Sequence, residues 1–168
     1  MTAGLILNAT ICFAITVSSL AFAWGLASSE DKHNEKSKPA LWALVILWSL
    51  VALTYLPTTI RMVAAITDHP SLDLIMYNLA AVPFSMVTVP LVFFILYVIT
   101  GDQKISGYIS FLFILFGATY LALLYSNGVI GPTITGYSSM FSINSDIAIN
   151  IYLVGLFVIP TAMILGMM

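Results

Sequence analysis

The stretch DLIMYNLAAVPFSMVTVPLVFFILYVIT, residues 73–100, decides the fold because it is apolar apart from the acid that opens it and a few small polar side chains. As an α-helix of about 28 residues it extends roughly 42 Å, more than the ~30 Å hydrocarbon thickness of a bilayer. Pro83 and Pro90 lie two turns apart on nearly one face, and each removes a backbone donor. We therefore predict a bent central helix, with Ser85 and Thr88 as hydroxyl donors to the freed carbonyls.

The composition of the whole chain is that of an integral membrane protein. Of 168 residues, 61% are hydrophobic and only 7% are charged, and the mean hydropathy is +1.07. A soluble domain carries about 25% charged residues, so this chain has too little charge to cover a surface that faces water. We predict a single membrane domain over residues 1–168, in contact with the lipid bilayer. No basic cluster points to nucleic acid, and the single cysteine, Cys12, excludes an internal disulfide.

Five apolar runs are each long enough to cross a bilayer. They cover about residues 5–27, 40–66, 73–100, 105–126 and 146–168. Helices satisfy their own backbone in lipid, and continuous apolar runs lack the alternation of a membrane β-barrel. The predicted fold class is therefore all-α, a polytopic bundle of five transmembrane helices.

The lysines in the short connections predict the orientation of the bundle. The first connection carries Lys32, Lys36 and Lys38, the third carries Lys104, and the second and fourth carry no lysine or arginine. By the positive-inside rule the first and third connections face the cytoplasm. We expect a multi-pass plasma-membrane protein with its N-terminus outside and its C-terminus in the cytoplasm.

Polar side chains within the spans gather, under this topology, near the outer ends of the helices. Ionisable residues inside a membrane are costly and mark functional sites by default. The inner half of the bundle contains little beyond serine and threonine. The candidate binding site is therefore an outer polar cluster made of Asn8, Arg61, Asp73, Asn78, Asp146 and Asn150.

Arg61 is the central candidate because a guanidinium below the interface needs a partner or must extend to water. Asp68, Asp73 and Asp146 are the acids on its side, and we expect a salt bridge to Asp73 or Asp146 that the asparagines complete with hydrogen bonds. Three interpretations are open: a structural clamp between spans, extension to the interface, and a pocket for an anionic or polar ligand. Asp73 and Asp146 also begin helices, where the helix dipole favours an acid without any function.

The connection over residues 127–145 is uncharged and contains three glycines and one proline. Its isoleucine, tyrosine, methionine and phenylalanine side chains suggest that it lies on the outer membrane surface. We expect either an ordinary interfacial loop or a functional lid or docking loop, since long connections in compact proteins are often functional.

Known catalytic and cofactor patterns do not occur in the sequence. The two histidines, His33 and His69, fall in connections on opposite faces, which argues against a bis-histidine haem, and every lysine lies in a connection, which argues against a retinal Schiff base. No HExxH, GxSxG, P-loop or CxxC motif is present. The sequence therefore predicts no catalytic residue, no cofactor and no metal site.

Residues 90–132 read as a proline-kinked span that ends in Tyr97-x-x-Thr100-Gly101, a short turn, another span, and then Ser126-Asn127-Gly128. This order resembles the middle of the seven-helix membrane region at the N-terminus of some bacterial and archaeal sensor histidine kinases. Here five spans are predicted rather than seven. The resemblance implies a signal-sensing membrane module that acts through a partner, and it assigns no functional residue.

The sequence as a whole predicts a non-enzymatic membrane module, either sensor-like or an accessory subunit of a membrane complex. Such a module works with other membrane chains or by self-association. One alternative is a small-solute transporter that acts as an oligomer, although a transporter should line a path with polar residues at mid-depth. Another alternative is a subunit of a respiratory or oxygenase membrane complex.

Overall fold

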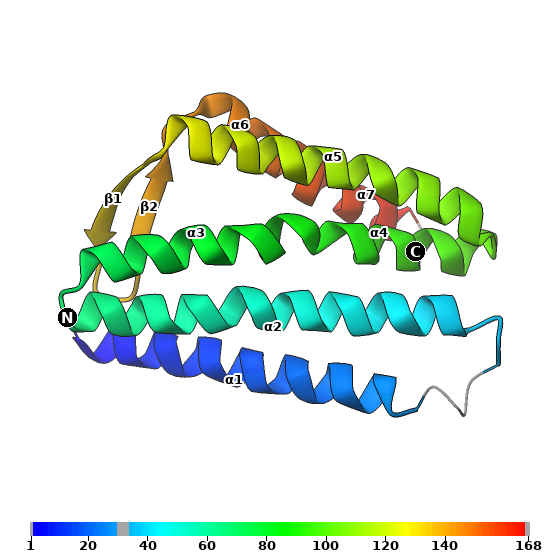
Figure 1. The fold of residues 1–168 in the computed structure, drawn as a ribbon, viewed down its shortest axis with the longest axis horizontal. Coiled ribbons are helices and arrows are strands. Elements are labelled where there is room, and N and C mark those ends of the chain that lie inside the picture. The colour runs from blue at the N-terminus through cyan, green and yellow to red at the C-terminus, as the bar shows by residue number, and fades with distance from the viewer. Residues whose placement is uncertain (1, 30–33, 167–168) are drawn as a thin grey trace.

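The computed structural model describes residues 2–29 and 34–166, so Lys32, His33 and the predicted end of the last span at Met168 lie outside the described residues. Within the described part, five helices are long and apolar enough to span a membrane, as predicted. Figure 1 shows these helices running side by side along the long axis of the molecule.

The first, second and fourth predicted spans are single helices: α1 (Thr2–Ala27), α2 (Lys38–Ile66) and α5 (Gln103–Asn127). The third span consists of α3 (Pro70–Met86) and α4 (Thr88–Thr100). The fifth consists of α6 (Asp146–Ile151), the π-helix η2 (Tyr152–Val158) and α7 (Ile159–Leu165). Between α5 and α6 the chain forms two strands, β1 (Val129–Ile134) and β2 (Ser139–Ile143).

Local chemistry explains where the fourth span begins. Gly101 has φ of 66° and ends α4 in the left-handed conformation that glycine adopts at little cost. The Asp102 side chain then accepts hydrogen bonds from the backbone N–H groups of Lys104 at 2.7 Å and Ile105 at 3.2 Å. This N-cap satisfies donors that have no partner within α5.

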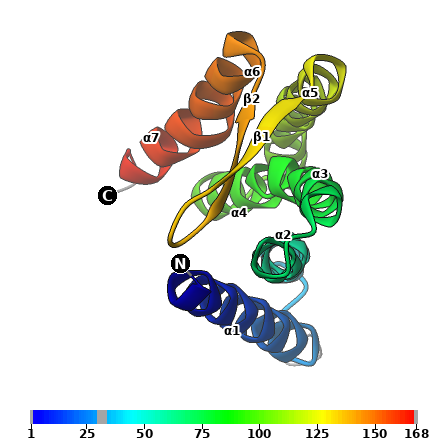
Figure 2. The ribbon, with the colours of Figure 1, turned by 90° about the vertical axis from the view of Figure 1, so that its left-hand side faces the viewer.

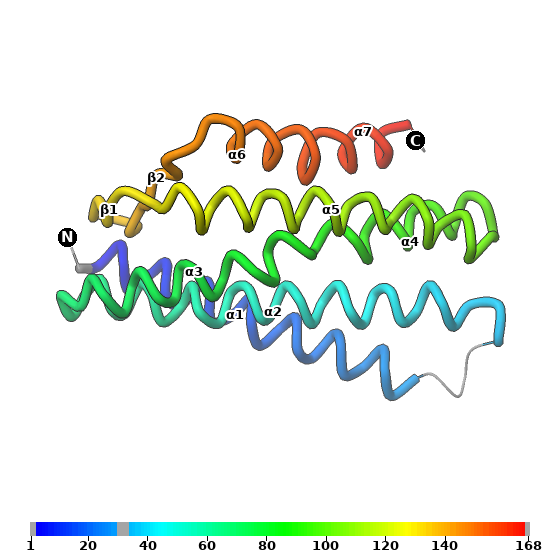
Figure 3. The backbone as a smooth tube through the Cα atoms, turned by 45° about the horizontal axis from the view of Figure 1, so that its top comes forward, coloured from blue at the N-terminus to red at the C-terminus, as the bar shows by residue number. Residues whose placement is uncertain are grey.

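The third span bends where α3 passes into α4, as Figure 3 shows. The predicted bend is present, but the predicted use of the two hydroxyls is wrong. Ser85 donates to the Val82 carbonyl at 2.8 Å, and Thr88 donates across the bundle to the Leu156 carbonyl at 3.2 Å. A proline frees the carbonyl of the residue four positions before it. Neither Val82 nor Leu156 lies four positions before Pro83 or Pro90, so neither hydroxyl bonds to a carbonyl that those prolines free.

The connection over residues 127–145, expected as an interfacial, lid or docking loop, forms a β-hairpin, which adds two strands to the predicted all-α bundle. The strands pair antiparallel, with Val129 opposite Ile143 and Ile134 opposite Ser139. Figure 2 shows the hairpin crossing the end of the bundle from α5 and α6 to the start of α1. A Cβ built on Gly4 of α1 would lie 2.2 Å from the Gly136 carbonyl oxygen, so the hairpin tip rests directly on that helix.

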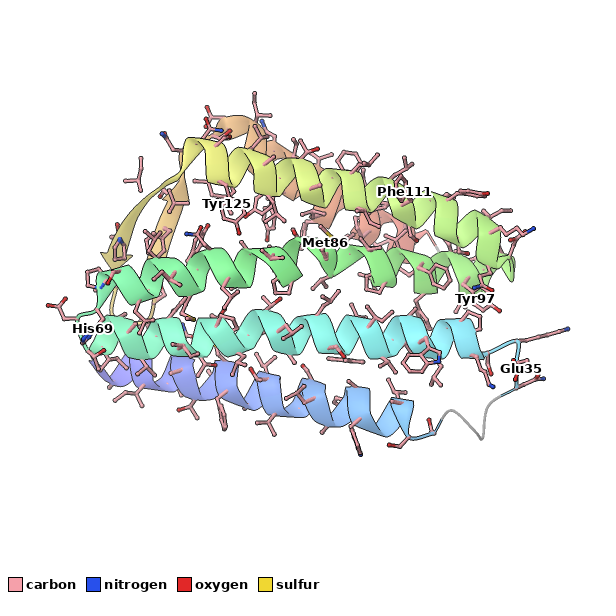
Figure 4. All side chains as sticks on the ribbon, viewed as in Figure 1. Glu35, His69, Met86, Tyr97, Phe111 and Tyr125 are labelled. Carbon is pink, nitrogen blue, oxygen red and sulfur yellow. The ribbon has the colours of Figure 1, made fainter. Side chains whose placement is uncertain are left out.

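The two ends of the bundle differ in chemistry, and we name them the hairpin end and the lysine end. The hairpin covers one end, where α2 stops at Ile66. The described lysines, Lys36, Lys38 and Lys104, lie at the other end. In Figure 4 the labelled His69 marks the hairpin end, and Glu35 and Tyr97 mark the lysine end.

The helices pack as a chain of neighbours rather than around one closed core. α1 packs on α2, α2 packs on α3 and α4, α5 packs on α3, α4 and the fifth span, and α7 returns to α4. Gly117 allows a close approach of α5 to α3, because a Cβ there would lie 2.7 Å from the Ser85 carbonyl oxygen. Many large apolar side chains point outward, among them Phe13, Phe22 and Phe111, each more than half exposed. An outer surface of this kind suits lipid as the surrounding solvent.

Candidate binding site beneath the hairpin

A buried ion pair joins α2 to α3 at the hairpin end. Arg61 lies in the second turn from the end of α2, Asp73 lies in the first turn of α3, and Arg61 Nε is 2.8 Å from Asp73 Oδ1. Arg61 is 8% exposed and Asp73 is 0% exposed. Of the two acids that the sequence left open as partners, Asp73 is the one used, because α3 follows α2 after a short connection and packs on it. Asp146 is exposed in the first turn of α6 and makes no bond to Arg61.

Strand β2 completes this ion pair. Arg61 Nη2 donates to the Ser139 carbonyl at 2.9 Å, and the Ser139 hydroxyl donates to Asp73 Oδ2. Ser139 is itself buried. Ser139 was not among the predicted site residues, since a serine within an apolar connection carries no signal that a hairpin will return it to the bundle. The hairpin is therefore held by hydrogen bonds to both members of the pair.

The Arg61 guanidinium is enclosed by aromatic rings. Its Cζ atom lies 4.8 Å from the centre of the Tyr77 ring and 5.3 Å from that of the Phe141 ring. Contacts of this kind attract a cation to the negative face of a ring. The side chain is turned into the bundle, so the interpretation in which Arg61 extends to the interface does not describe this structure.

The remaining members of the predicted cluster lie at the hairpin end but do not join the ion pair. Asn8 Nδ2 donates to the Tyr137 carbonyl at 2.8 Å, which ties α1 to the hairpin tip. The backbone carbonyl of Asn78 accepts a hydrogen bond from the Tyr125 hydroxyl at 2.9 Å. Asn150 is exposed on α6. Of the six predicted residues, Asn8, Arg61 and Asp73 form side-chain hydrogen bonds to the hairpin. Among the described residues the side chains of Asn78, Asp146 and Asn150 form none to it.

A cavity of about 380 Å³ lies beside the ion pair, between α2, α3, α5, η2 and β2. Its size falls in the range of about 300–1,000 Å³ that is typical of small-molecule sites. The described lining residues are mostly aromatic or small: Thr54, Tyr55, Thr58, Arg61, Tyr77, Ala80, Ala81, Phe84, Tyr120, Ile143 and Tyr152. The α3 residues of this wall lie between the levels of His69 and Met86 in Figure 4, so the cavity occupies the half of the bundle nearer the hairpin.

Four tyrosines give the cavity its polar character: Tyr55, Tyr77, Tyr120 and Tyr152. In the described part of the chain none of their hydroxyls has a protein hydrogen-bond partner, although those of Tyr97 and Tyr125 do. No described buried side-chain nitrogen or oxygen is left unsatisfied, so these hydroxyls are accessible to a water-sized molecule. None of these tyrosines was among the predicted site residues, because their convergence from four separate helical segments has no local signature.

The π-helix η2 supplies one wall of the cavity and meets the bend of the third span. Pro160 has no N–H to donate to the Leu156 carbonyl, and Thr88 at the start of α4 donates to that carbonyl instead. Gly155 lets η2 approach α5, since a Cβ there would lie 3.1 Å from the Phe116 ring. The irregular parts of the third and fifth spans are thus in direct contact.

Chemically, the site offers hydrogen-bond donors and aromatic faces. Among the described residues no group of three or more histidine, cysteine or acidic side chains is placed to hold a metal ion. Comparisons with protein-family models, curated proteins and solved structures found no match to this chain. The resemblance of residues 90–132 to sensor-kinase membrane regions therefore stays a prediction from sequence.

Proposed function

We propose that this chain is a non-enzymatic, multi-pass plasma-membrane module of the sensor-like kind, oriented with the hairpin end outside. In this proposal the cavity beneath the hairpin binds a small molecule. The bound state is then passed to another membrane chain, or to a second copy of this one, because nearly all of the chain lies within the bilayer.

The observation that carries this proposal is the cavity with its four tyrosine hydroxyls, which form no hydrogen bond to any residue that the structure describes. A hydroxyl without a hydrogen bond in an apolar environment costs free energy, about 1–3 kcal/mol by mutational measures. Four tyrosines of this kind line one space, which supports its occupation by water or by polar atoms of a ligand. The Arg61–Asp73 pair and the Ser139 contacts hold the wall and the hairpin cover in place.

The neighbouring backbone supports a signalling role over a purely structural one. π-helical segments are rare and are frequent at functional sites. Here η2 contributes Tyr152 to the cavity, and its Leu156 carbonyl accepts a hydrogen bond from the Thr88 hydroxyl. A ligand that moved Tyr152 would therefore act on the junction between the third and fifth spans.

Small molecules that co-purify with the protein test the binding proposal. Wild-type protein would be purified from its native membranes into nanodiscs, and the extracted small molecules would be identified by mass spectrometry. Ala81 lines the cavity, so Ala81→Phe should fill it and deplete any specific molecule. Ala122, exposed on α5, gives the matched control Ala122→Phe, which should retain the molecule. Equal recovery from both variants would contradict the proposal.

Partner chains can be identified in the same native membranes. A tagged chain should recover a stoichiometric membrane partner or a second copy of itself after mild solubilisation. Recovery with haem- or metal-bearing chains would favour the alternative of a subunit in a respiratory or oxygenase complex. Isolation as a monomer alone would count against the sensor-like and accessory roles.

Transport by an oligomer is the second candidate, and the two interrupted spans favour it. Secondary transporters commonly place their substrate sites at discontinuous helices near the middle of the bilayer. In a background that carries Cys12→Ala, the cavity residue Thr58 can be replaced by cysteine and labelled from each side of sealed vesicles. A transporter should be labelled from both sides, and a sensor from the hairpin side only.

A further inference from the structure

We infer that the cavity beneath the hairpin selects an uncharged molecule with a flat aromatic or conjugated body and a hydrogen-bond-accepting oxygen, such as an aromatic ketone or a quinone. This inference rests on the proposed binding function and narrows its ligand. It departs from the anionic ligand that an isolated arginine in the sequence suggests.

The charges around the cavity favour an uncharged ligand. Arg61 is the only charged residue among the described residues that line the cavity, and Asp73 already compensates it at 2.8 Å. An anion near the guanidinium would also lie near the Asp73 carboxylate, in a site where two like charges repel strongly. A cation finds no accessible carboxylate, because Asp73 is 0% exposed and both of its oxygens accept hydrogen bonds.

The hydrogen-bonding groups of the cavity favour a ligand with an acceptor oxygen. A guanidinium has five N–H donors, and two of those of Arg61 are used in the bonds to Asp73 and Ser139. In the described chain the four cavity tyrosines add hydroxyls that donate to no protein group. Thr54 and Thr58 donate to carbonyls of their own helix and so contribute little. The unused guanidinium N–H groups can only donate and the tyrosine hydroxyls can donate, so an acceptor oxygen on the ligand can bond to either kind of group.

The aromatic side chains of the cavity favour a flat ligand. Tyr152 packs against Phe84 with ring centres 5.4 Å apart and against Tyr120 at 5.9 Å, so these three lining residues form one aromatic cluster. Tyr77 lies two turns before Phe84 on α3 and also packs on the guanidinium. Offset stacking on such rings favours a planar ring system over a branched aliphatic one.

Three matched probes separate these requirements. Fluorenone is flat and uncharged and has one carbonyl, fluorene lacks the carbonyl, and fluorenone carboxylate adds a negative charge. Each probe is titrated against the whole chain in nanodiscs. The rise in the unfolding midpoint of the protein gives an apparent Kd for the probe. The response of Ala81→Phe in the same nanodiscs is subtracted, which removes the effect of partition into lipid.

We expect fluorenone to bind wild type and not Ala81→Phe. Fluorene should bind about 2- to 12-fold more weakly, the factor for one neutral hydrogen bond. The carboxylate should bind at least about 10-fold more weakly, because it adds a second buried anion beside Asp73. At least one phenylalanine substitution among Tyr55, Tyr77, Tyr120 and Tyr152 should weaken fluorenone and leave fluorene unchanged. Tyr125→Phe, whose hydroxyl is used elsewhere, is the control.

Failure of this inference is distinct from failure of the binding proposal. Binding of the carboxylate as tight as that of fluorenone, or equal binding of fluorene, would overturn the ligand class. A charged molecule recovered from wild type and lost in Ala81→Phe would overturn it too, while the cavity itself would stand as a binding site. If Ala81→Phe alters neither the recovered molecules nor any probe titration, the binding proposal itself fails.

Discussion

The buried ion pair makes Asp73→Asn the most informative single substitution. The change keeps the shape of the side chain and removes its charge, so the Arg61 guanidinium stays 8% exposed with no counter-charge. Breaking a buried pair by removing one partner costs about 3–5 kcal/mol in soluble proteins. The amide oxygen can still accept one hydrogen bond from Arg61 Nε. We therefore expect the free energy of unfolding to fall by about 3 kcal/mol, near the lower end of that range.

The free-energy cost of Asp73→Asn is much smaller if the ion pair contributes only hydrogen bonds. Hydrogen bonds between transmembrane helices average only about 0.6 kcal/mol, because the unfolded chain in a membrane also finds partners. If the pair contributes only hydrogen bonds, Asp73→Asn should cost about 1 kcal/mol or less. The size of the loss therefore separates a charge effect from a hydrogen-bond effect.

The assay is reversible unfolding in mixed micelles, with Asp68→Asn as the matched control. Asp68 is an exposed acid at the same end of the bundle, and its substitution should stay within about 0.5 kcal/mol of wild type. Arg61→Gln alone, and combined with Asp73→Asn, completes a double-mutant cycle. We expect the double variant to lose less than the sum of the single losses by about 2 kcal/mol. Additive losses, or a loss below about 1 kcal/mol for Asp73→Asn, would refute the assignment of Arg61 and Asp73 as a clamp.

Three further predictions concern close contacts. Gly117→Ala places a Cβ against a backbone carbonyl and should cost about 1–3 kcal/mol, whereas Gly107→Ala in the same helix meets nothing within 4 Å and should be neutral or stabilising by up to about 1 kcal/mol. Equal unfolding midpoints for the two variants would show that α5 does not pack as closely as described. Thr88→Val loses the bond across the bundle and should cost about 0.5–1.5 kcal/mol, and Thr119→Val, whose hydroxyl bonds within its own exposed turn, should cost less. Gly4→Ala should displace the hairpin tip and speed amide exchange over residues 129–143, and unchanged exchange would contradict that contact.

The helices were predictable because their signal is local. In lipid each span must satisfy its own backbone, so a continuous apolar run of sufficient length is enough to predict a helix. The bend of the third span was equally predictable from Pro83 and Pro90. The partner of the Thr88 hydroxyl was not, because Leu156 belongs to a span far along the chain and offers a free carbonyl only through Pro160.

The hairpin was missed because its strands are short and uncharged, and because β1 is interrupted by Gly131 and Pro132. Its position depends on two distant contacts, Gly136 on α1 and Ser139 on the ion pair. Neither contact leaves a periodic trace in residues 127–145. The tyrosine-lined cavity was missed for the same reason, since each of its tyrosines is an ordinary aromatic residue within its own helix.

The sequence by itself determined the class of this protein: five apolar helices, a polar layer near one end, and an arginine that needs an acid. Length and hydropathy decide these features residue by residue, without reference to the rest of the chain. Only the tertiary structure decided that Asp73 rather than Asp146 is the acid, that Ser139 closes the pair, and that four tyrosines converge on one cavity. Those features depend on which helix faces meet, and packing between distant segments sets that choice.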